Sequence, residues 1–342
     1  MITRYVLGSL VAAAVAVGIP RGLVEAAEFY KDKQIRLVVG TDAGGGYDFS
    51  ARLISRHIAR SIPGNPQIVV QNMPGADSLV AANFIYNVAP QDGTVVGAVV
   101  QTLPQTQLFG DKNVKFDSSK FEWIGTPSSS VSVIATWHTA PVKTFQDART
   151  TPIVMGASGQ VGLDYTLATM LNSVLGTKFQ VVSGYKGGNE VELAMERGEV
   201  SGRAGQAWAG WKVTRPDWIK ERKLNLLAQI GLTRAKDLPD IPLVLDFAET
   251  DEQRQILTLF SSTVALGRPL VLGPRVAAEH VATMRESFRK TVSDPLFLAD
   301  AAKAGYDVGP IFGEEMQMIV TRLMATPTQV AARAKAAITT TR

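Results

Sequence analysis

Short apolar runs alternate with segments of helical periodicity in the first third of the chain. Residues 34–40, 67–71 and 94–100 are rich in apolar side chains and are bounded by Gly, Pro, Asn and Asp, which predicts three short strands. Apolar side chains recur at helical spacing in residues 49–62, and residues 78–88 form a second predicted helix. Strand, helix, strand, helix, strand is the pattern of a parallel α/β sheet.

The same pattern returns after residue 150. Residues 153–156 and 179–183 are predicted strands, and residues 165–175 and 190–197 are predicted helices. Each of these strands runs into a glycine-containing loop. Two α/β blocks therefore follow one another, without a repeat at the level of individual residues.

Two further strand-like runs, residues 123–134 and 224–231, lead into and out of the second block. If the chain passes between the domains twice, the first domain is discontinuous. Two connecting strands also define a hinge better than a single linker does. A chain of 342 residues also fits two domains better than one. We therefore expect one domain from residues 27–124 and 232–342, and a second from residues 125–231.

Composition narrows the class of protein. Hydrophobic residues make up 46% of the chain and charged residues 19%, as in a globular protein. The formal net charge is +4, but Lys and Arg are scattered, whereas a nucleic-acid binder concentrates them on one stripe. The absence of Cys excludes disulfides and thiolate metal sites, and the three His residues lack a metal-binding spacing. We expect no nucleic-acid partner, no metal and no cofactor.

Residues 1–26 have the features of a secretory signal peptide. Arg4 precedes an uncharged apolar stretch at residues 6–19, and residues 24–26 have the spacing that a signal peptidase prefers. A membrane anchor is the alternative, but the stretch is shorter than the roughly 20 residues that span a bilayer. Cleavage would place the mature protein in the periplasm.

Residues 40–48 (GTDAGGGYD) place three consecutive glycines between a predicted strand and a predicted helix. Such a turn lets the backbone approach a ligand, and it directs unpaired N–H groups at the positive end of the helix dipole toward an anion. Neither the dinucleotide pattern G-x-G-x-x-G nor the phosphate-loop pattern G-x-x-x-x-G-K-[ST] fits this stretch. The simpler interpretation is a tight turn with Asp48 as the helix N-cap, which is compatible with ligand binding by the glycines.

The sequence around Ser158 does not match the nucleophile-elbow pattern of hydrolases. Ser158 stands in G-A-S-G, but Gln160 occupies the position where a nucleophile elbow has Gly, and His280 lies far along the chain. We therefore interpret Ser158 as a hydrogen-bond donor.

The remaining aromatic candidates have structural explanations. Core or hinge packing is favoured over ligand stacking for three tryptophans, Trp208, Trp211 and Trp218. His57 has Arg neighbours on a predicted helix and is expected at the surface.

Two long stretches, IRLVVGTDAGGGYDFSARLISRHI and VVQNMPGADSLVAANFIYNVAPQDGTVVG, are followed in order by VMGASGQVG, VVSGYKGGNEVELAMERGEVSG and LLAQIGLTRAKDLPDIP. This ordered set resembles the tripartite tricarboxylate transporter receptors, the Bug or TctC family of extracytoplasmic solute-binding proteins. The similarity spans residues 28–320. It implies a type II periplasmic-binding-protein fold, in which two α/β domains joined by crossing strands close a ligand cleft on a small organic acid.

The resemblance also implies ligand-binding residues. In the family, backbone amides and waters of the first glycine loop grip the ligand carboxylate, and loops of the second domain cover it. Carried onto this chain, the first group is Gly44, Gly45, Gly46, Tyr47 and Asp48. The opposing group is Ser158, Gly159, Gln160, Tyr185, Lys186, Gly187 and Gly188, with Gln206 at the pocket edge. Lys186 either holds an anion by its charge or points to solvent.

This chain departs from the family pattern at two turns. Thr41 and Asp42 replace a usual aromatic and a small residue, and Asp77 and Ser78 replace the glycines that usually follow Pro-Gly-Ala. An acid beside an anion site weakens binding unless it is paired or points away. One hypothesis is that the ligand carries an amine, an amide or hydroxyls that meet Asp42. The alternative is that Asp42 caps the turn or faces solvent.

We therefore expect a monomeric receptor without catalysis that closes about a hinge and delivers an organic acid to a membrane transporter of the tripartite tricarboxylate type. A sensory receptor for a membrane signalling protein is an alternative that the sequence does not separate from transport. An enzyme on the same fold would need a base in the cleft, and none stands out in the sequence.

Overall fold

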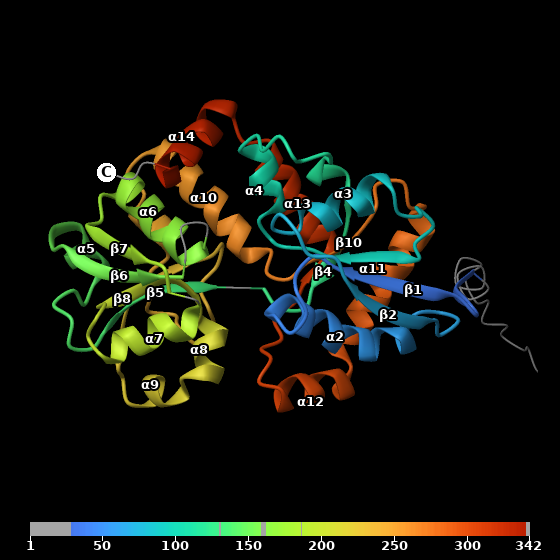
Figure 1. Ribbon diagram of the computed structural model, residues 1–342, viewed down its shortest axis with the longest axis horizontal. Coiled ribbons are helices and arrows are strands. Elements are labelled where there is room, and N and C mark those ends of the chain that lie inside the picture. The colour runs from blue at the N-terminus through green and yellow to red at the C-terminus, as the bar shows by residue number, and fades with distance from the viewer. Residues whose placement is uncertain (1–28, 130, 159–161, 186, 340–342) are drawn as a thin grey trace, which may run out of the picture.

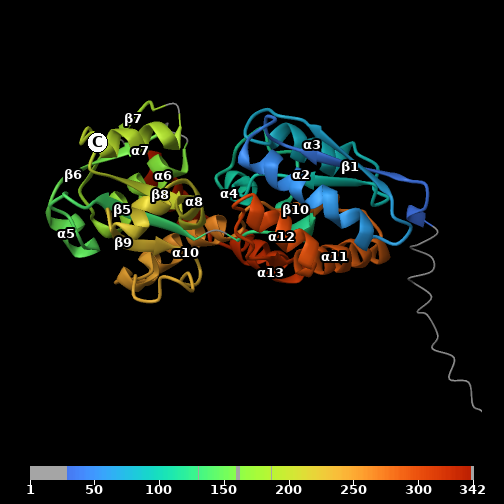
Figure 2. The ribbon, with the colours of Figure 1, turned by 90° about the horizontal axis from the view of Figure 1, so that it is seen from below.

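The computed structural model describes residues 29–129, 131–158, 162–185 and 187–339, which form two α/β lobes lying side by side (Figures 1 and 2). The predicted signal peptide lies outside the described residues, as do Gly159, Gln160 and Lys186. None of the described helices combines the length and the apolar character that crossing a membrane requires.

The first lobe is built on a six-stranded sheet in the order β11-β4-β10-β3-β1-β2. Its strands are β1 (Gln34–Val39), β2 (Gln67–Asn72), β3 (Val95–Ala98), β4 (Glu122–Thr126), β10 (Leu270–Leu272) and β11 (Ile311–Phe312). β1 is parallel to β2 and β3, whereas β10 is antiparallel to β3 and β4. Along β1, Leu37 and Val39 join one apolar cluster and Val38 joins the other, because successive side chains point to opposite faces of a sheet.

Helices cover both faces of this sheet. They are α2 (Gly46–Ile58), α3 (Leu79–Asn87), α4 (Leu103–Leu108), α11 (Ala278–Ser293), α12 (Pro295–Lys303) and α13 (Gly313–Met324), with the short 3-10 helices η1 (Ala59–Ser61) and η2 (Ser118–Lys120). The predicted alternation of strands and helices in residues 34–100 is confirmed, although α2 begins three residues before the predicted start at residue 49.

The second lobe has a five-stranded sheet in the order β7-β6-β8-β5-β9. Its strands are β5 (Ser132–Trp137), β6 (Ile153–Ala157), β7 (Phe179–Ser183), β8 (Gly202–Ala207) and β9 (Leu224–Ile230). Its helices are α5 (Phe145–Thr150), α6 (Leu163–Leu175), α7 (Gly188–Glu196), α8 (Trp208–Thr214) and α9 (Pro216–Lys220), followed by the 3-10 helix η3 (Val244–Phe247). The predicted core packing is confirmed for three tryptophans, Trp208, Trp211 and Trp218, which are buried together.

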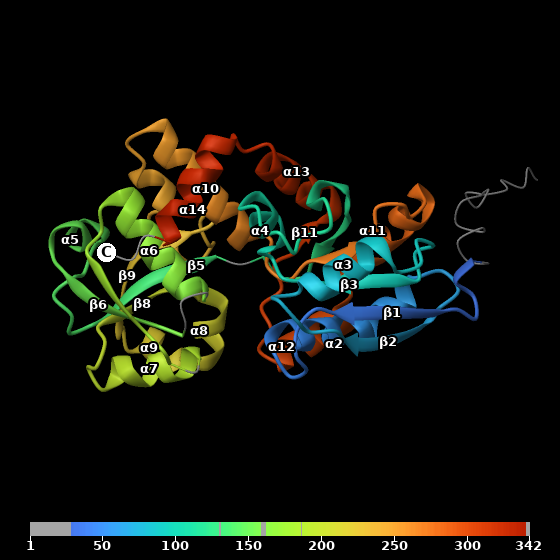
Figure 3. The same cartoon turned by 45° about the horizontal axis from the view of Figure 1, so that its top comes forward.

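Two helices from the last third of the chain lie beside α6, as Figures 1 and 3 show: α10 (Asp251–Ala265) and α14 (Thr328–Thr339). Phe260 of α10 and Ala334 of α14 share an apolar cluster with Leu171 of α6. Residues 232–342 were expected to complete the first domain, but this stretch divides its packing between the lobes. We propose that α10 and α14 belong to the second lobe and that the chain crosses between β4 and β5, at residues 266–269 and at residues 325–327.

The crossings bring the loop-bearing edges of the two sheets together. Val39, Ala98, Leu270 and Gly125 align at one edge of the first sheet, where β1, β2 and β3 end. β4 ends at Thr126 of that edge, and β5 begins at Ser132, so roughly 20 Å of extended chain is the upper limit between the two edges. Ser132 aligns with Ala207, at the edge where the parallel strands β6, β7 and β8 end. The loops of the two lobes therefore face one another across the crossings.

The surface position expected for His57 is wrong. The side chain is buried, its Nε2 lies 3.0 Å from Asp300 Oδ2 of α12, and its ring meets Phe297 edge to face. The helical pattern of α2 alone does not reveal that α12, which is more than 200 residues later, covers this face.

A matched pair of substitutions tests the place of α14. Ala334→Asp would put a carboxylate into the apolar cluster, because Ala334 is 0% exposed. We expect it to lower the free energy of unfolding by at least about 2 kcal/mol. Ala332→Asp on the exposed face of the same helix should change it by less than about 0.5 kcal/mol. Amide hydrogen exchange should accelerate in β6 for Ala334→Asp; acceleration in β1 instead would contradict the assignment of α14.

Candidate ligand-binding site

Three loops of the first lobe meet where β1, β2 and β3 end. Met73 N donates to Val39 O over 2.7 Å, which joins the loop after β2 to the end of β1. Asn72 Nδ2 donates to Thr41 O over 3.0 Å. Gln101 N, after β3, donates to the hydroxyl of Tyr47 over 3.3 Å. The loop after β1 is thus held between the other two, at the position where ligands bind in open α/β sheets.

Asp48 anchors the glycine loop. Its buried carboxylate accepts hydrogen bonds from Gly44 N at 2.8 Å, from Arg52 Nε at 2.9 Å and from Asn72 Nδ2 at 2.9 Å. The hydrogen bonds from Arg52, Gly44 and Asn72 outweigh burial and lower the pKa of Asp48 from 3.8 to about 2. The N-cap prediction for Asp48 is wrong, because the cap is Gly45 and Asp48 is the third helical residue. Its carboxylate fixes the loop from below, whereas the three glycines are exposed.

The first turn of α2 offers backbone amides that have no acceptor within the part of the chain that the structure describes. The first intrahelical bond runs from Phe49 N to Gly45 O over 2.8 Å, so the N–H groups before it have no helical acceptor. Gly45 has no side chain to cap them. The backbone N–H groups and the helix dipole together make this end of α2 positive.

Arg268 also lies at the start of α2, and the sequence analysis did not identify it. A Cβ at Gly46 would stand 3.1 Å from Arg268 Nη2, so the absence of a side chain at Gly46 lets the guanidinium approach α2. The guanidinium lies 5.7 Å from the ring centroid of Tyr306, whose hydroxyl is 2.7 Å from Ser50 Oγ. No carboxylate of the described part of the chain forms an ion pair with Arg268. No spacing in the sequence marks this residue, because only the return crossing brings it to α2.

Tyr47 has a structural role at this site. Its half-buried ring packs against both apolar clusters of the first lobe. Its hydroxyl donates to Gly267 O over 3.4 Å, besides accepting from Gln101 N. Burial raises the pKa of Tyr47 to about 12, so the phenol remains a neutral donor. Tyr47 therefore joins the glycine loop to the return crossing at residues 266–269.

The described residues of the predicted second-lobe group lie after β6, after β7 and, for Gln206, within β8. Ser158 donates from N and Oγ to Asp164 Oδ2, over 3.0 and 3.1 Å. Gly187 and Gly188 begin α7, and the half-buried Tyr185 packs against an apolar cluster of that lobe. The parallel register of β6 and β7 brings Ser158 and Tyr185 to one edge.

Gln206, the predicted pocket-edge residue, is already hydrogen-bonded within the protein. Its Oε1 accepts from Arg203 Nη1 over 2.6 Å. The geometry does not support the hydrolase hypothesis. Ser158 Oγ bonds to Asp164, whereas His280 packs against Phe29 and Tyr30 in the other lobe.

The two acids that depart from the family pattern differ in their surroundings. Asp42 is exposed, and its carboxylate has no hydrogen-bond or ion-pair partner among the residues that the structure describes. Asp77 accepts from Thr102 Oγ1 over 3.2 Å. Ala76, Asp77 and Ser78 have φ of 46°, 51° and 71°, an uncommon left-handed run for residues other than glycine. These three residues thus adopt a backbone conformation that glycine would adopt more easily.

Polar contacts also join the lobes near this edge. Lys212 Nζ of α8 lies 3.1 Å from Asp237 Oδ2 and 3.2 Å from Asp307 Oδ2 of the segment before β11. Ser129 N donates to Gly309 O over 2.6 Å, and Arg268 N donates to Thr126 Oγ1 over 2.9 Å. The segments at 126–129, 266–268 and 307–309 therefore lie together at the junction of the lobes.

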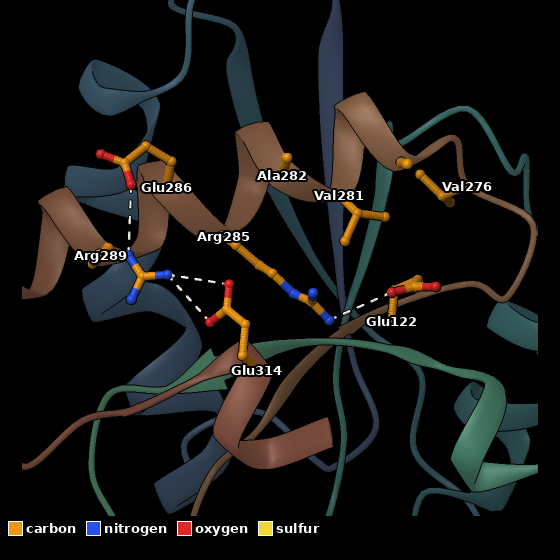
Figure 4. Close-up of a pocket in the computed structure, with 9 residues that line it drawn as sticks. Glu122, Val276, Val281, Ala282, Arg285, Glu286, Arg289 and Glu314 are labelled. Carbon is orange, nitrogen blue, oxygen red and sulfur yellow. Dashed lines mark hydrogen bonds and ion pairs between the residues drawn. The ribbon is translucent and has the colours of Figure 1, made fainter. Parts of the chain in front are cut away.

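A cavity of about 480 Å³ lies at the opposite edge of the first sheet, between α11 and the starts of β4 and α13 (Figure 4). Arg285 points toward Glu122 at 3.4 Å, and Arg289 lies between Glu286 at 3.5 Å and Glu314 at 3.2 Å. Its cations are thus paired with carboxylates, unlike Arg268. None of the residues that the sequence predicted for binding lines this cavity.

Known proteins share the sequence pattern and the architecture. The family model described as "Tripartite tricarboxylate transporter family receptor" (TctC) matches residues 51–326. A UPF0065 protein of the gbd 5′ region of Cupriavidus necator is 26% identical over 318 residues, which are 90% of this chain and 89% of that protein.

Solved structures of solute-binding proteins have the same two-lobed fold. A ligand-free TctC solute-binding protein from Polaromonas superposes with a TM-score of 0.69 at 18% identity, covering 88% of this chain and 98% of that one. An R. palustris protein determined with adipate has a TM-score of 0.59 at 18% identity, covering 89% and 97%. These similarities confirm the predicted type II periplasmic-binding-protein fold. Since the family model matches most of the chain, this protein belongs to the tripartite tricarboxylate transporter receptors.

Proposed function

We propose that this receptor binds the carboxylate of a small organic acid at the start of α2, between the amides of the glycine loop and the guanidinium of Arg268. The observation that carries the proposal is the position of Arg268 beside Gly46, without a carboxylate partner among the described residues. A cation at a helix N-terminus is unfavourable, because both are positive. An anion between the guanidinium and the helix N-terminus would be attracted by both and would offset their mutual repulsion.

The second lobe supplies the cover. Its loops at Ser158 and Gly187–Gly188 lie on the edge that faces the first lobe across the crossings. A ligand that touches both edges makes its full set of contacts only when the lobes are closed, so binding favours closure. The proposal involves binding alone, with no chemical step.

The ligand class follows from the charges. The guanidinium of Arg268, without a carboxylate partner among the described residues, and a set of amides suit one carboxylate at the first lobe. The R. palustris neighbour was determined with adipate, a dicarboxylate, which makes organic diacids the first class to test. Asp42 remains exposed near the loop, so a ligand with an amine or hydroxyls is the alternative.

Location and partners complete the proposal. With the predicted signal peptide removed, the receptor would work in the periplasm and deliver its ligand to the membrane subunits of a tripartite tricarboxylate transporter. A sensing role would replace those subunits with a membrane signalling protein. Recovery of membrane partners with the immobilised mature chain, with and without ligand, distinguishes the two, because transporter subunits should be recovered only for the first.

A thermal-shift screen followed by calorimetry tests the binding site. Monocarboxylates, dicarboxylates including adipate, amino acids and aromatic acids are added to the mature chain, since a ligand of the folded state raises Tm. For the best acid, Arg268→Gln should weaken binding about 10- to 100-fold, as expected for loss of a charged hydrogen bond. Arg275→Gln is the matched control, because Arg275 is exposed beyond the opposite end of β10. Equal affinities of Arg268→Gln and wild type would contradict the proposed site.

Substitution of Asp42 separates the two ligand hypotheses. Calorimetry on Asp42→Ala with the same acid should show weaker binding if an amine or hydroxyl of the ligand meets this carboxylate. Unchanged or tighter binding would remove Asp42 from the site and favour a simple acid, because an unpaired carboxylate near the loop repels an anion.

The pH dependence of stability tests the anchor of the loop. Because the folded-state pKa of Asp48 is about 2, below its ordinary 3.8, the ionised group stabilises the fold above about pH 4. This contribution is lost as the pH falls toward 2. Asp48→Asn should therefore lower the free energy of unfolding at pH 7, and the difference from wild type should shrink between pH 4 and pH 2. Asp42→Asn serves as the control, and a difference for Asp48→Asn that is constant with pH would refute the ionised anchor.

A further inference from the structure

Four charged side chains form a connected cluster beneath the loops of the second lobe: Asp164, Glu192, Arg203 and Arg215. Arg203 Nη2 lies 3.2 Å from Asp164 Oδ2, and Arg203 Nη1 lies 3.8 Å from Glu192 Oε1. Arg215 Nε lies 3.0 Å from Glu192 Oε2. Two guanidinium groups thus balance two carboxylates.

The centre of this cluster is deeply buried. The side chains of Asp164 and Glu192 are each 2% exposed, and that of Arg203 is 10% exposed. Glu192 also accepts a hydrogen bond from the buried indole Nε1 of Trp211 over 2.9 Å. Removing one partner of such a pair leaves an uncompensated buried charge, so the four side chains depend on one another.

Arg203 contacts residues at the carboxyl ends of all three parallel strands: at the start of α6, at the start of α7 and within β8. After β6, it pairs with Asp164, which accepts from the N and Oγ of Ser158. After β7, it fills the space where a side chain at Gly188 would lie, because a Cβ there would stand 2.5 Å from Nη1. Within β8, its Nη1 donates to Gln206 Oε1 over 2.6 Å. One planar guanidinium therefore joins the start of α6, the start of α7 and the end of β8.

We infer that Arg203 is a positioning residue for ligand binding: it holds Ser158, Gly188 and Gln206 in the arrangement that covers the ligand. This inference rests on the proposed function, since it assumes that these loops touch the ligand. Arg203 itself lies below the loops and does not contact the ligand. Lysine does not replace it, because an ammonium lacks the fork that reaches Asp164 and Gln206 together.

The first lobe provides an internal reference for the test. There, the amide of Gly44 donates to buried Asp48, just as the amide of Ser158 donates to buried Asp164. Hydrogen exchange at these two amides, followed by NMR on the ligand-free mature chain, reports on each loop separately. Arg203→Lys keeps the charge, and Arg197→Lys is the matched control on an exposed arginine of the same lobe.

We expect Arg203→Lys to accelerate exchange at Ser158 at least tenfold, while Gly44 keeps its wild-type rate. Affinity for adipate, or for the best acid of the thermal-shift screen, should fall at least tenfold with little change in Tm. Because Arg203→Gln alone leaves two carboxylates with one cation, the double variant Arg203→Gln/Glu192→Gln restores the charge balance. It should recover Tm without recovering either the exchange rate of Ser158 or the affinity.

Two results would overturn the inference. One is exchange at Ser158 that matches wild type and Arg197→Lys. The other is faster exchange with undiminished affinity, which would make Arg203 a purely structural residue. Failure of the proposed function looks different, because Arg268→Gln would then leave the affinity unchanged whatever Arg203→Lys does to Ser158.

Discussion

The start of α2 concentrates positive potential that the described residues do not neutralise. Gly45 caps the helix without a side chain, and the guanidinium of Arg268 lies against Gly46. An acidic side chain directed at this place would be favourable, because carboxylates are stabilising at helix N-termini. Here the nearby acid, Asp48, is turned inward to hold Gly44, Arg52 and Asn72. The proposed binding of an organic acid depends on this positive potential, which the inward-facing Asp48 does not cancel. The proposed coverage of the ligand by the second lobe depends on that binding in turn.

Both lobes use the same device behind their first loops. In each, a buried Asp near the start of a helix accepts a backbone amide from the loop before it: Asp48 from Gly44, and Asp164 from Ser158. Each Asp is itself held by an arginine, Arg52 in the first lobe and Arg203 in the second. Gly44 and Ser158 are thus held by groups of their own lobes, which would reduce the entropy cost of the proposed binding. The lobes differ in that Arg52 is half exposed and bonds to Asp48 and Asn72, whereas Arg203 is buried and contacts Asp164, Glu192 and Gln206.

Local patterns in the sequence predicted much of this structure. Strands at residues 34–40, 67–71 and 179–183 and the glycine loop between β1 and α2 follow from periodicity and turn residues, which are local properties. The packing of α10 and α14 does not, because their apolar faces show only that each is covered and not by which lobe. His57 was misjudged for the same reason, since α12 covers it from far along the chain.

Local patterns indicated the loops of the candidate site but not its arginine residues. Turn composition and family resemblance pointed to Gly44–Gly46 and to the loops of the second lobe. They also suggested Asp48, but as a helix cap and a ligand contact rather than as the buried anchor of the loop. Arg268 and Arg203 carry no local signal, because each becomes meaningful only where a crossing or a neighbouring strand places it beside a glycine.

A crystal structure of the mature chain with a bound organic acid would test the central claim most directly. The account predicts one carboxylate of the ligand about 3 Å from amide nitrogens of residues 45–47 and from the guanidinium of Arg268. A ligand bound away from α2, with Arg268 paired to a protein carboxylate instead, would contradict it.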